Sequence, residues 1–221
     1  MNLICFFDMD KTLIGGNSAV SFMRYCLRRG KTTRWKVMKS IVYYLLYRYD
    51  FLDMEKAYRD SLRLLVGTRE EDLMQLCQEW FEDAIRNLIY PEAPDIVRHH
   101  LNQGERVVII SNATTYAVAP LARYLDVPHV LATQLEVRQG LFTGNYIEPL
   151  CFRHGKVFWA EKLAKELGEE IGRSTFYTDS ITDLPLLERV GTRQVVNPDP
   201  KLRSLAKKRG WPVRDLAPPE S

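Results

Sequence analysis

Cysteine is scarce in this chain of 221 residues, and its spacing argues against two kinds of small fold. The four cysteines lie far apart and form no CxxC pair: Cys5, Cys26, Cys77 and Cys151. Zinc knuckles and disulfide-rich domains need closely spaced cysteines, so we expect buried free thiols in a reducing compartment instead. The adjacent His99 and His100 point in different directions on a helix, and no matching ligand cluster is expected near them.

Long hydrophobic runs are also missing. The longest apolar stretch covers residues 41–47, whereas a membrane-spanning helix needs about 20 apolar residues. The first residues show neither a basic leader nor a small-residue cleavage site, and the apolar run of residues 3–7 ends in acidic side chains. We therefore expect no membrane span, no export signal and a cytoplasmic location.

Neither sign of charge dominates, because 31 Lys and Arg residues nearly balance 28 Asp and Glu residues. This balance gives no reason to expect a protein that coats nucleic acid, and no nucleic-acid partner is predicted. Internal repeats are absent too, and only residues 217–221 are predicted to form a loose tail. With 46% hydrophobic residues, the chain can form one globular domain and a smaller insert.

What the sequence does contain is a regular alternation of apolar and amphipathic patterns. Residues 3–7 are typical of a strand buried on both faces of a parallel sheet. Helical patterns then follow, and beyond Pro91 strand and helix patterns alternate. The alternation predicts an α/β fold, a doubly wound and mostly parallel Rossmann-like sheet with an inserted all-helical domain. We predict that the helical insert comprises residues 15–87, and the sheet domain residues 1–14 and 88–221.

The predicted elements mark where a site should lie. Helices of the insert are expected at residues 17–29, 33–49, 53–66 and 69–88. Later strands are expected at residues 106–110, 129–131, 175–178 and 194–196, with a hairpin turning at Gln139-Gly140. Later helices are expected at residues 115–125, 155–167, 184–190 and 201–210. Ligands bind beyond the carboxyl ends of the strands in such sheets, so the residues after each strand are candidate site residues.

Polar side chains follow the predicted strands and begin one predicted helix. Asp8, Asp10 and Thr12 alternate after the first strand, and two acids this close need a cation or a shared proton. Further along the chain come Ser111-Asn112, Lys156, Asp179 and Asp183. Each alone has an ordinary alternative as a turn, a helix cap or a solvated helix residue. Their order at successive strand ends favours one shared site for phosphate and a metal ion.

These residues resemble the four signature motifs of the haloacid dehalogenase superfamily of phosphohydrolases. The matching motifs are Asp8-Met9-Asp10-Lys11-Thr12, Ser111-Asn112, Lys156, and Asp179 with Asp183. The similarity runs through most of the chain. The early helical insert resembles the cap domain of the phosphoserine-phosphatase-like branch, and residues 131–156 fit that branch as well. The resemblance implies magnesium-dependent hydrolysis of a phosphomonoester.

The resemblance also implies a role for each residue. Asp8 is expected to be the nucleophile that forms an aspartyl-phosphate, and Asp10 the general acid and base. Mg²⁺ is expected to bind the carboxylates of Asp8 and Asp179 and the main-chain carbonyl of Asp10. Lys156 is expected to neutralise negative charge, while Asp183 orients Lys156 or a metal-bound water. The phosphoryl oxygens are expected to bind Thr12, Ser111 and the N–H of Asn112.

Three places depart from the family pattern. Lys11 stands where glycine is frequent, which puts an extra positive charge next to the site; the side chain faces either the substrate or, as we expect, solvent. Thr182 stands where asparagine is common, which leaves the outer shell of the metal undefined. Phosphoserine phosphatases have glycines after the motif-two serine and an acid soon after the first motif. This chain has Asn112-Ala113 and residues 15–18 without an acid, so phosphoserine is not the expected substrate.

Substrate choice in this branch resides mainly in the cap, where this chain has a basic segment at residues 24–48. The segment contains eight Lys or Arg residues and no acid. Its large apolar side chains recur at helical intervals, which is typical of a face packed against other helices: Trp35, Met38, Val42, Leu45 and Tyr49. An anionic membrane surface, a lipid phosphate or a second anionic group of the substrate are alternative contacts.

The predicted function is hydrolysis of a small-molecule phosphomonoester with Mg²⁺ as cofactor. A phosphotransferase that uses the same aspartyl-phosphate is one alternative. A lipid-phosphate phosphatase, or a membrane-surface binding protein that uses the basic segment, is another. The complete set of Asp8, Asp10, Lys156 and Asp179 favours an enzyme over a binding protein.

Overall fold

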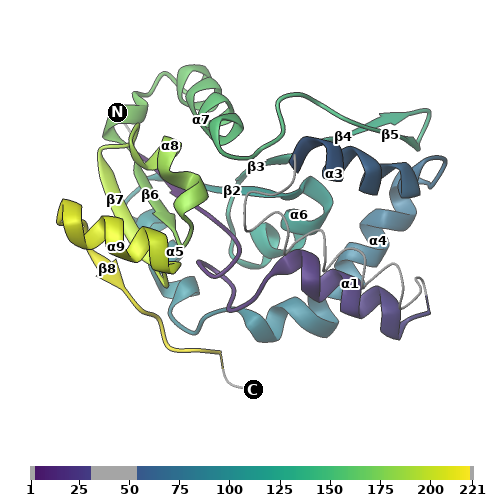
Figure 1. Cartoon of the computed structure of the whole chain (residues 1–221), viewed down its shortest axis with the longest axis horizontal. Helices are drawn as coiled ribbons and strands as arrows, with labels where there is room; N and C mark the ends of the chain where they lie inside the picture. The colour runs from purple at the N-terminus through teal and green to yellow at the C-terminus, as the bar shows by residue number, and fades with distance from the viewer. Residues whose placement is uncertain (1–2, 31–53, 220–221) are drawn as a thin grey trace.

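A six-stranded parallel sheet forms the centre of the computed structural model, which describes residues 3–30 and 54–219 (Figure 1). The strand order is β3-β2-β1-β6-β7-β8. The strands are β1 (Ile4–Phe7), β2 (Arg106–Thr114), β3 (His129–Thr133), β6 (Thr175–Thr178), β7 (Thr192–Val196) and β8 (Val213–Arg214). The prediction of a parallel α/β sheet is confirmed.

The first strand lies inside this sheet because all four of its side chains are apolar and buried. Phe7 pairs with Ile109 of β2 on one side and with Tyr177 of β6 on the other. From β1 the chain first builds β2 and β3 on one side and then returns to β6 on the other. The strand order therefore reverses at β1, and the carboxyl ends of β1, β2 and β6 meet at the edge where ligands bind in such sheets.

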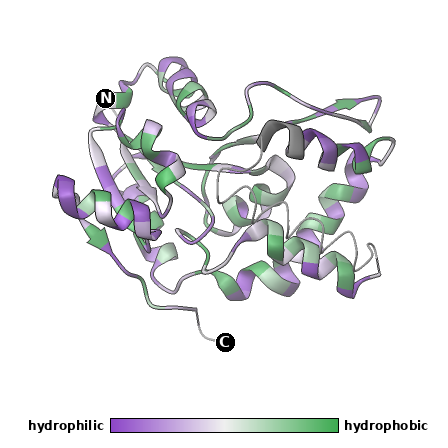
Figure 2. Cartoon of the chain, in the orientation of Figure 1, coloured by the Kyte–Doolittle hydropathy of each residue, from purple (hydrophilic) through white to green (hydrophobic). Residues whose placement is uncertain are grey.

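Helices cover both faces of the sheet and bury an apolar cluster on each. The cluster with Cys5 and Phe7 of β1 is covered by α5 (Ala93–Asn102) and α6 (Thr115–Tyr124). The cluster with Ile4 and Phe6 is covered by α7 (His154–Glu166), α8 (Leu184–Leu187) and α9 (Pro200–Arg209). Along these helices hydrophobic and hydrophilic residues alternate, as expected for helices that bury one side (Figure 2).

The described chain between β1 and β2 is helical, as predicted. It comprises α1 (Ser18–Arg28), α3 (Met54–Leu62), a 3₁₀ turn (Arg63–Leu65), α4 (Glu70–Trp80), a π-helical turn (Phe81–Ile85) and a second 3₁₀ turn (Arg86–Leu88). The predicted helix at residues 33–49 lies outside the described residues, as does the basic segment beyond Gly30. The boundaries of the insert at residues 15 and 87 remain a prediction.

An antiparallel hairpin joins the helical insert to the sheet domain. Its strands, β4 (Leu135–Arg138) and β5 (Leu141–Tyr146), flank the predicted turn at Gln139-Gly140, which is confirmed. Phe142 and Tyr146 share an apolar cluster with Leu62 and Leu73 of the insert. Chain segments on both sides of β2 therefore build one packing unit beside the sheet.

The end of the chain differs from its prediction. The short strand β8 was not predicted, and it adds to the sheet by pairing with β7. The segment 217–219 was predicted to be loose, but it packs against the chain. The N–H of Ala217 donates to Glu92 at 3.3 Å, and a Cβ atom added to Gly15 would lie 2.7 Å from the Pro219 ring. The described part of the tail thus lies against the loop that leaves β1.

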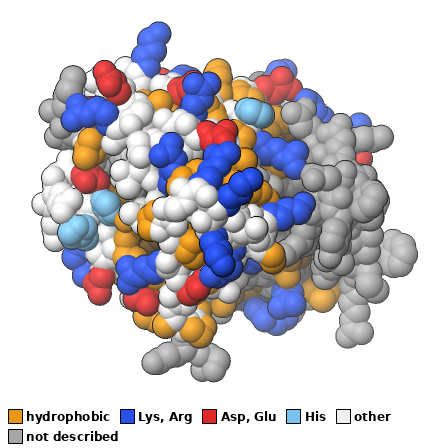
Figure 3. Space-filling view, turned by 60° about the vertical axis from the view of Figure 1, so that its left-hand side comes forward, with side chains coloured by type: hydrophobic (Ala, Val, Ile, Leu, Met, Phe, Trp, Pro, Cys, Tyr) orange, Lys and Arg blue, Asp and Glu red, His pale blue; other side chains and the backbone are white. Residues whose placement is uncertain are grey.

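Charged side chains of both signs are spread over the face that includes the left-hand side of Figure 1 (Figure 3). Exposed ion pairs, such as Arg203 with Asp215 and Arg209 with Glu188, join neighbouring elements there. Such exposed pairs contribute little to stability individually. Within residues 3–30 and 54–219, no helix combines the length and apolar character needed to cross a membrane.

Candidate active site

Asp8 directly follows β1 and belongs to a buried ion cluster. Its N–H donates to the carbonyl of Tyr177 at 2.9 Å, which ties the residue to β6. Lys156 Nζ donates to Asp8 Oδ1 at 2.6 Å and to Asp183 Oδ2 at 2.8 Å. The Thr178 hydroxyl donates to the same Asp183 oxygen at 2.6 Å. The three charged side chains are buried, so the lysine is fixed between two carboxylates.

Carboxylates outnumber cationic groups in this cluster. Burial raises the pKa of Asp8, and the charge of Asp183 adds to this increase while Lys156 opposes it. Burial also raises the pKa of Asp179 well above its ordinary value, and the charge of Asp8 adds to it. Burial by itself would lower the pKa of Lys156, but Asp183 and Asp8 together raise it. The lysine therefore stays charged, and one lysine does not balance the surrounding carboxylates.

A divalent cation fits this unbalanced set of oxygen ligands. Asp8 and Asp179 follow β1 and β6, which are neighbours in the sheet. The charge of Asp8 raises the pKa of Asp179, so the two carboxylates are close enough to repel each other. A bound cation relieves such repulsion, and carboxylate and carbonyl oxygens are the ligands that Mg²⁺ prefers.

Asp10 has different surroundings from Asp8. Its Oδ1 accepts the N–H of Ser18 at 2.9 Å, and its Oδ2 accepts the Ser18 hydroxyl at 3.1 Å. Asn17 Nδ2 also donates to Oδ2, at 3.2 Å. Burial raises the pKa of Asp10 to about 6, although these Ser18 donors lower it. A carboxyl group with a pKa near neutrality is suited both to give and to accept a proton.

Two buried polar atoms at the same edge of the sheet have no hydrogen-bond partner among the described residues. They are Thr12 Oγ1, in the turn after β1, and Asn112 Oδ1, in β2. Both atoms are therefore open to a ligand at this edge, the Thr12 hydroxyl as a donor or acceptor and the Asn112 amide oxygen as an acceptor. The neighbouring Ser111 is buried as well, and its hydroxyl accepts the N–H of Ala113 at 3.2 Å.

A tight turn before α7 places Lys156. The backbone of Gly155 lies so close to Leu150 that a Cβ atom would be 1.8 Å from the Leu150 carbonyl oxygen. Only glycine fits at this position. The next residue, Lys156, is therefore held at the start of α7 with its side chain directed into the carboxylate cluster.

The structure shows the surroundings of two residues that depart from the family pattern, Lys11 and Thr182. Lys11 adopts φ +56°, the left-handed conformation that glycine tolerates best, which explains why glycine is frequent there. Lys11 is half-buried, and its charge opposes the effect of burial on the pKa of Asp10 and of Asp179. The positive charge of Lys11 thus acts on the site, as expected from its place in the sequence, although the side chain is only partly in solvent. Thr182 bonds to the Ser180 hydroxyl at 2.9 Å.

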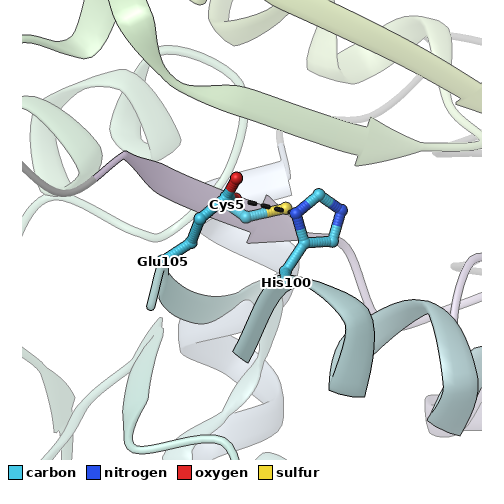
Figure 4. A group of neighbouring side chains, drawn as sticks. All are labelled: Cys5, His100 and Glu105. Atoms are coloured by element: carbon cyan, nitrogen blue, oxygen red, sulfur yellow. Dashed lines mark hydrogen bonds and ion pairs between the residues drawn. The ribbon is translucent and has the colours of Figure 1, made fainter. Parts of the chain in front are cut away.

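A second cluster of polar side chains lies near the amino ends of β1 and β2 (Figure 4). Ligand atoms of Cys5, His100 and Glu105 lie within 4.8 Å of one another, so the expectation that no such group surrounds His100 was wrong. His100 Nδ1 is 2.7 Å from Glu105 Oε2, and its Nε2 is 3.0 Å from the Tyr177 hydroxyl. Burial raises the pKa of the Cys5 thiol well above its ordinary value, which disfavours the thiolate that binds metals. We interpret the cluster as a hydrogen-bonded histidine inside the core.

Comparison with known proteins identifies the family. The model of the haloacid dehalogenase-like hydrolases matches residues 5–188. This chain belongs to that family. A probable phosphatase of Mycobacterium tuberculosis is 34% identical over 98% of this chain and 76% of its own length. The chain is therefore a hydrolase of the phosphatase class, as predicted.

Two further matches cover nearly whole proteins. A histidinol-phosphatase of Neisseria meningitidis is 30% identical over 96% of this chain and 98% of its own length. The crystal structure of a protein with unknown function from Bordetella pertussis superimposes with a TM-score of 0.89 at 31% identity, over 97% of this chain and 99% of the other. Phosphoserine phosphatases also match, in sequence and in fold, which confirms the resemblance to that branch.

Proposed function

We propose that this phosphatase is a magnesium-dependent phosphomonoester hydrolase that forms an aspartyl-phosphate on Asp8. The observation that carries the proposal is the buried Lys156 between Asp8 and Asp183. The unpartnered hydroxyl of Thr12 lies at the same sheet edge. A fixed cation beside a carboxylate, with a free hydroxyl nearby that can donate a hydrogen bond, suits a charged phosphoryl group.

In the first step a carboxylate oxygen of Asp8 attacks phosphorus, and the bond from phosphorus to the leaving alcohol oxygen breaks. Asp10, as the protonated acid, gives its proton to that oxygen. In the second step a water molecule attacks the aspartyl-phosphate and Asp10 takes its proton. Inorganic phosphate leaves, and the Asp8 carboxylate is regenerated.

The other residues supply charge and position. Lys156 neutralises charge on Asp8 and on the transferred group, and Asp183 holds Lys156 in place. Thr12, Ser111 and the N–H of Asn112 bind the phosphoryl oxygens. Mg²⁺, held by the carboxylates of Asp8 and Asp179 and the main-chain carbonyl of Asp10, would supply the positive charge that this cluster lacks.

For the substrate we propose a small alkyl phosphomonoester that carries an amine. The support is the similarity to the histidinol-phosphatase, which extends over nearly the full length of both chains. The residues that depart from the phosphoserine-phosphatase pattern, Asn112-Ala113 and 15–18, argue against phosphoserine as the preferred member of this class. L-Histidinol phosphate and phosphoserine are therefore the first two compounds to compare.

The test is phosphate release from a panel of alkyl and aryl phosphomonoesters, with and without Mg²⁺, by the wild type and Asp8→Asn. We expect release that needs Mg²⁺ and disappears in the variant, with L-histidinol phosphate above phosphoserine. Reaction in ¹⁸O-labelled water with an added alcohol distinguishes hydrolysis from transfer. Label in the phosphate supports a hydrolase, whereas a phosphorylated alcohol favours the phosphotransferase. A wild type without release from any compound would contradict the proposal.

A further inference from the structure

Ser18, the first residue of α1, and the N-cap residue Asn17 donate three hydrogen bonds to Asp10, the acid and base of the proposed function. Ser18 supplies its N–H and its hydroxyl, and Asn17 supplies its side-chain amide. An ionised carboxylate has about four lone-pair positions for hydrogen bonds. Two donors occupy Oδ2 and one occupies Oδ1, so the position left for proton exchange is on Oδ1.

These donors sit where the chain passes from the sheet domain to the helical insert. The outgoing and returning chains pair there: Ile14 bridges Ile89, and the N–H of Gly15 donates to Leu88 at 2.6 Å. Asn17 then caps α1 by accepting the N–H of Val20 at 3.0 Å. The start of α1 is thus fixed to the paired linkers, which holds its donors against Asp10.

We propose that Asn17 and Ser18 are positioning residues that hold Asp10 for proton transfer. The inference rests on the proposed function, because it assigns the two residues a part in the same reaction. Their role is to fix Asp10 with Oδ1 free for exchange. Neither residue needs to touch the phosphoryl group.

The leaving group distinguishes this role from a structural one. An alkoxide is a poor leaving group, so an alkyl phosphate needs the proton from Asp10 when its bond to phosphorus breaks. A nitrophenolate leaves without that proton. Because kcat/KM reports steps up to the first irreversible one, it isolates the formation of the aspartyl-phosphate. Misplacing Asp10 should therefore lower kcat/KM for alkyl phosphates and spare p-nitrophenyl phosphate.

The main variant is Ser18→Ala, and its matched control is Ser21→Ala. Both remove one hydroxyl from α1, but the Ser21 hydroxyl accepts from Trp80 Nε1 at 3.1 Å instead of donating to Asp10. We measure kcat/KM for p-nitrophenyl phosphate and for the best alkyl phosphate of the panel. Loss of one donor should lower the alkyl-to-aryl ratio about tenfold in Ser18→Ala, a part of the about 10²–10⁴-fold effect of acid catalysis. The ratio should stay at the wild-type value in Ser21→Ala.

Two further variants separate donation from helix capping. Ser18→Thr keeps the hydroxyl and should restore the ratio. Asn17→Ser keeps a good capping residue but shortens the donor, so the ratio should fall while the thermal unfolding midpoint stays near that of the wild type.

Two results would overturn the inference alone: an unchanged ratio in both Ser18→Ala and Asn17→Ser, or an equal loss with both substrates. An inactive wild type would overturn the proposed function and the inference with it. An active wild type that loses activity in Asp8→Asn keeps the proposed function whatever the Ser18 variants show.

Discussion

At the scale of the single residue, the burial of Lys156 links stability to chemistry. A buried ammonium group is tolerated because two carboxylates accept its hydrogen bonds. The carboxylates depend on the lysine in turn, because the charge of Lys156 offsets the cost of burying Asp8 and Asp183. A residue that the proposed reaction uses for charge is therefore also a residue that the fold needs.

We expect Lys156→Ala to lower the free energy of unfolding by about 3–5 kcal/mol, the cost of leaving buried charges unpaired. Lys162→Ala is the control, because Lys162 lies on the same helix but is exposed. A change within about 0.5 kcal/mol is expected there, as for other surface substitutions. Urea unfolding at neutral pH measures both. Equal stability of the two variants would show that Lys156 has no structural role.

The protonation of His129 makes the free energy of unfolding depend on pH. Burial, with a contribution from the charge of Arg106, lowers the pKa of His129 below its ordinary value of 6.5. The folded state thus favours the neutral ring, so this contribution is complete above pH 6.5. It is lost as the pH falls through 6.5 toward the folded pKa, because the unfolded chain takes up the proton first. We expect the stability difference between wild type and His129→Gln to shrink from pH 8 to pH 5.5. Urea unfolding at intervals across that range provides the measurement, and a constant difference would contradict the assignment.

At the scale of the element, the sequence predicted the helices and strands that depend on a local pattern of apolar residues. Buried apolar runs located β1 and β2, and Asp8, which directly follows β1, belongs to the ion cluster with Lys156. The contacts that the sequence did not predict form only when different elements pack against one another. Nothing in the pattern indicates that Ser18 turns back to Asp10, or that His100 reaches Tyr177 on β6. The two-residue strand β8 is too short to leave a periodic signal.

The start of α7 offers a test of how an element positions Lys156, a side chain of the proposed reaction. A methyl group at Gly155 would collide with the Leu150 carbonyl, so Gly155→Ala must shift the first turn of α7 and with it Lys156. We expect a loss of about 1–3 kcal/mol in stability, as for other overpacked sites, and a large fall in phosphatase activity. Gly172→Ala is the control, because a Cβ there meets no atom within 4 Å. Similar activity in the two variants would contradict this account of how Lys156 is placed.

At the scale of the whole molecule, the helical insert shares its apolar core with the sheet domain. Tyr25 and Trp80 of the insert belong to the same buried cluster as Val118 and Leu121 of α6. Polar contacts join α4 and α6 as well. The Tyr116 hydroxyl donates to Glu70 at 2.6 Å, and Arg123 donates to Gln78 at 2.6 Å. On this side the described part of the insert therefore shares its core with the sheet domain. Its stability depends on that of the sheet domain.

The shared core predicts that the insert and the sheet unfold together. Trp80 is fully buried in the insert, whereas Trp159 lies on the opposite face of the sheet, in the cluster with Phe6. Two variants that each keep one of these tryptophans, with the others changed to phenylalanine, report on the two regions separately. In each variant we expect the fluorescence and the far-UV circular dichroism to change at the same urea concentration, as a single cooperative transition requires. If the Trp80 signal changed at a lower concentration than the circular dichroism of the same variant, the insert would be unfolding before the sheet. The contact between α1 and Asp10 would then be lost before Asp8 and Lys156 separate, so the proposed proton donor would lose its position while the proposed nucleophile was still in place.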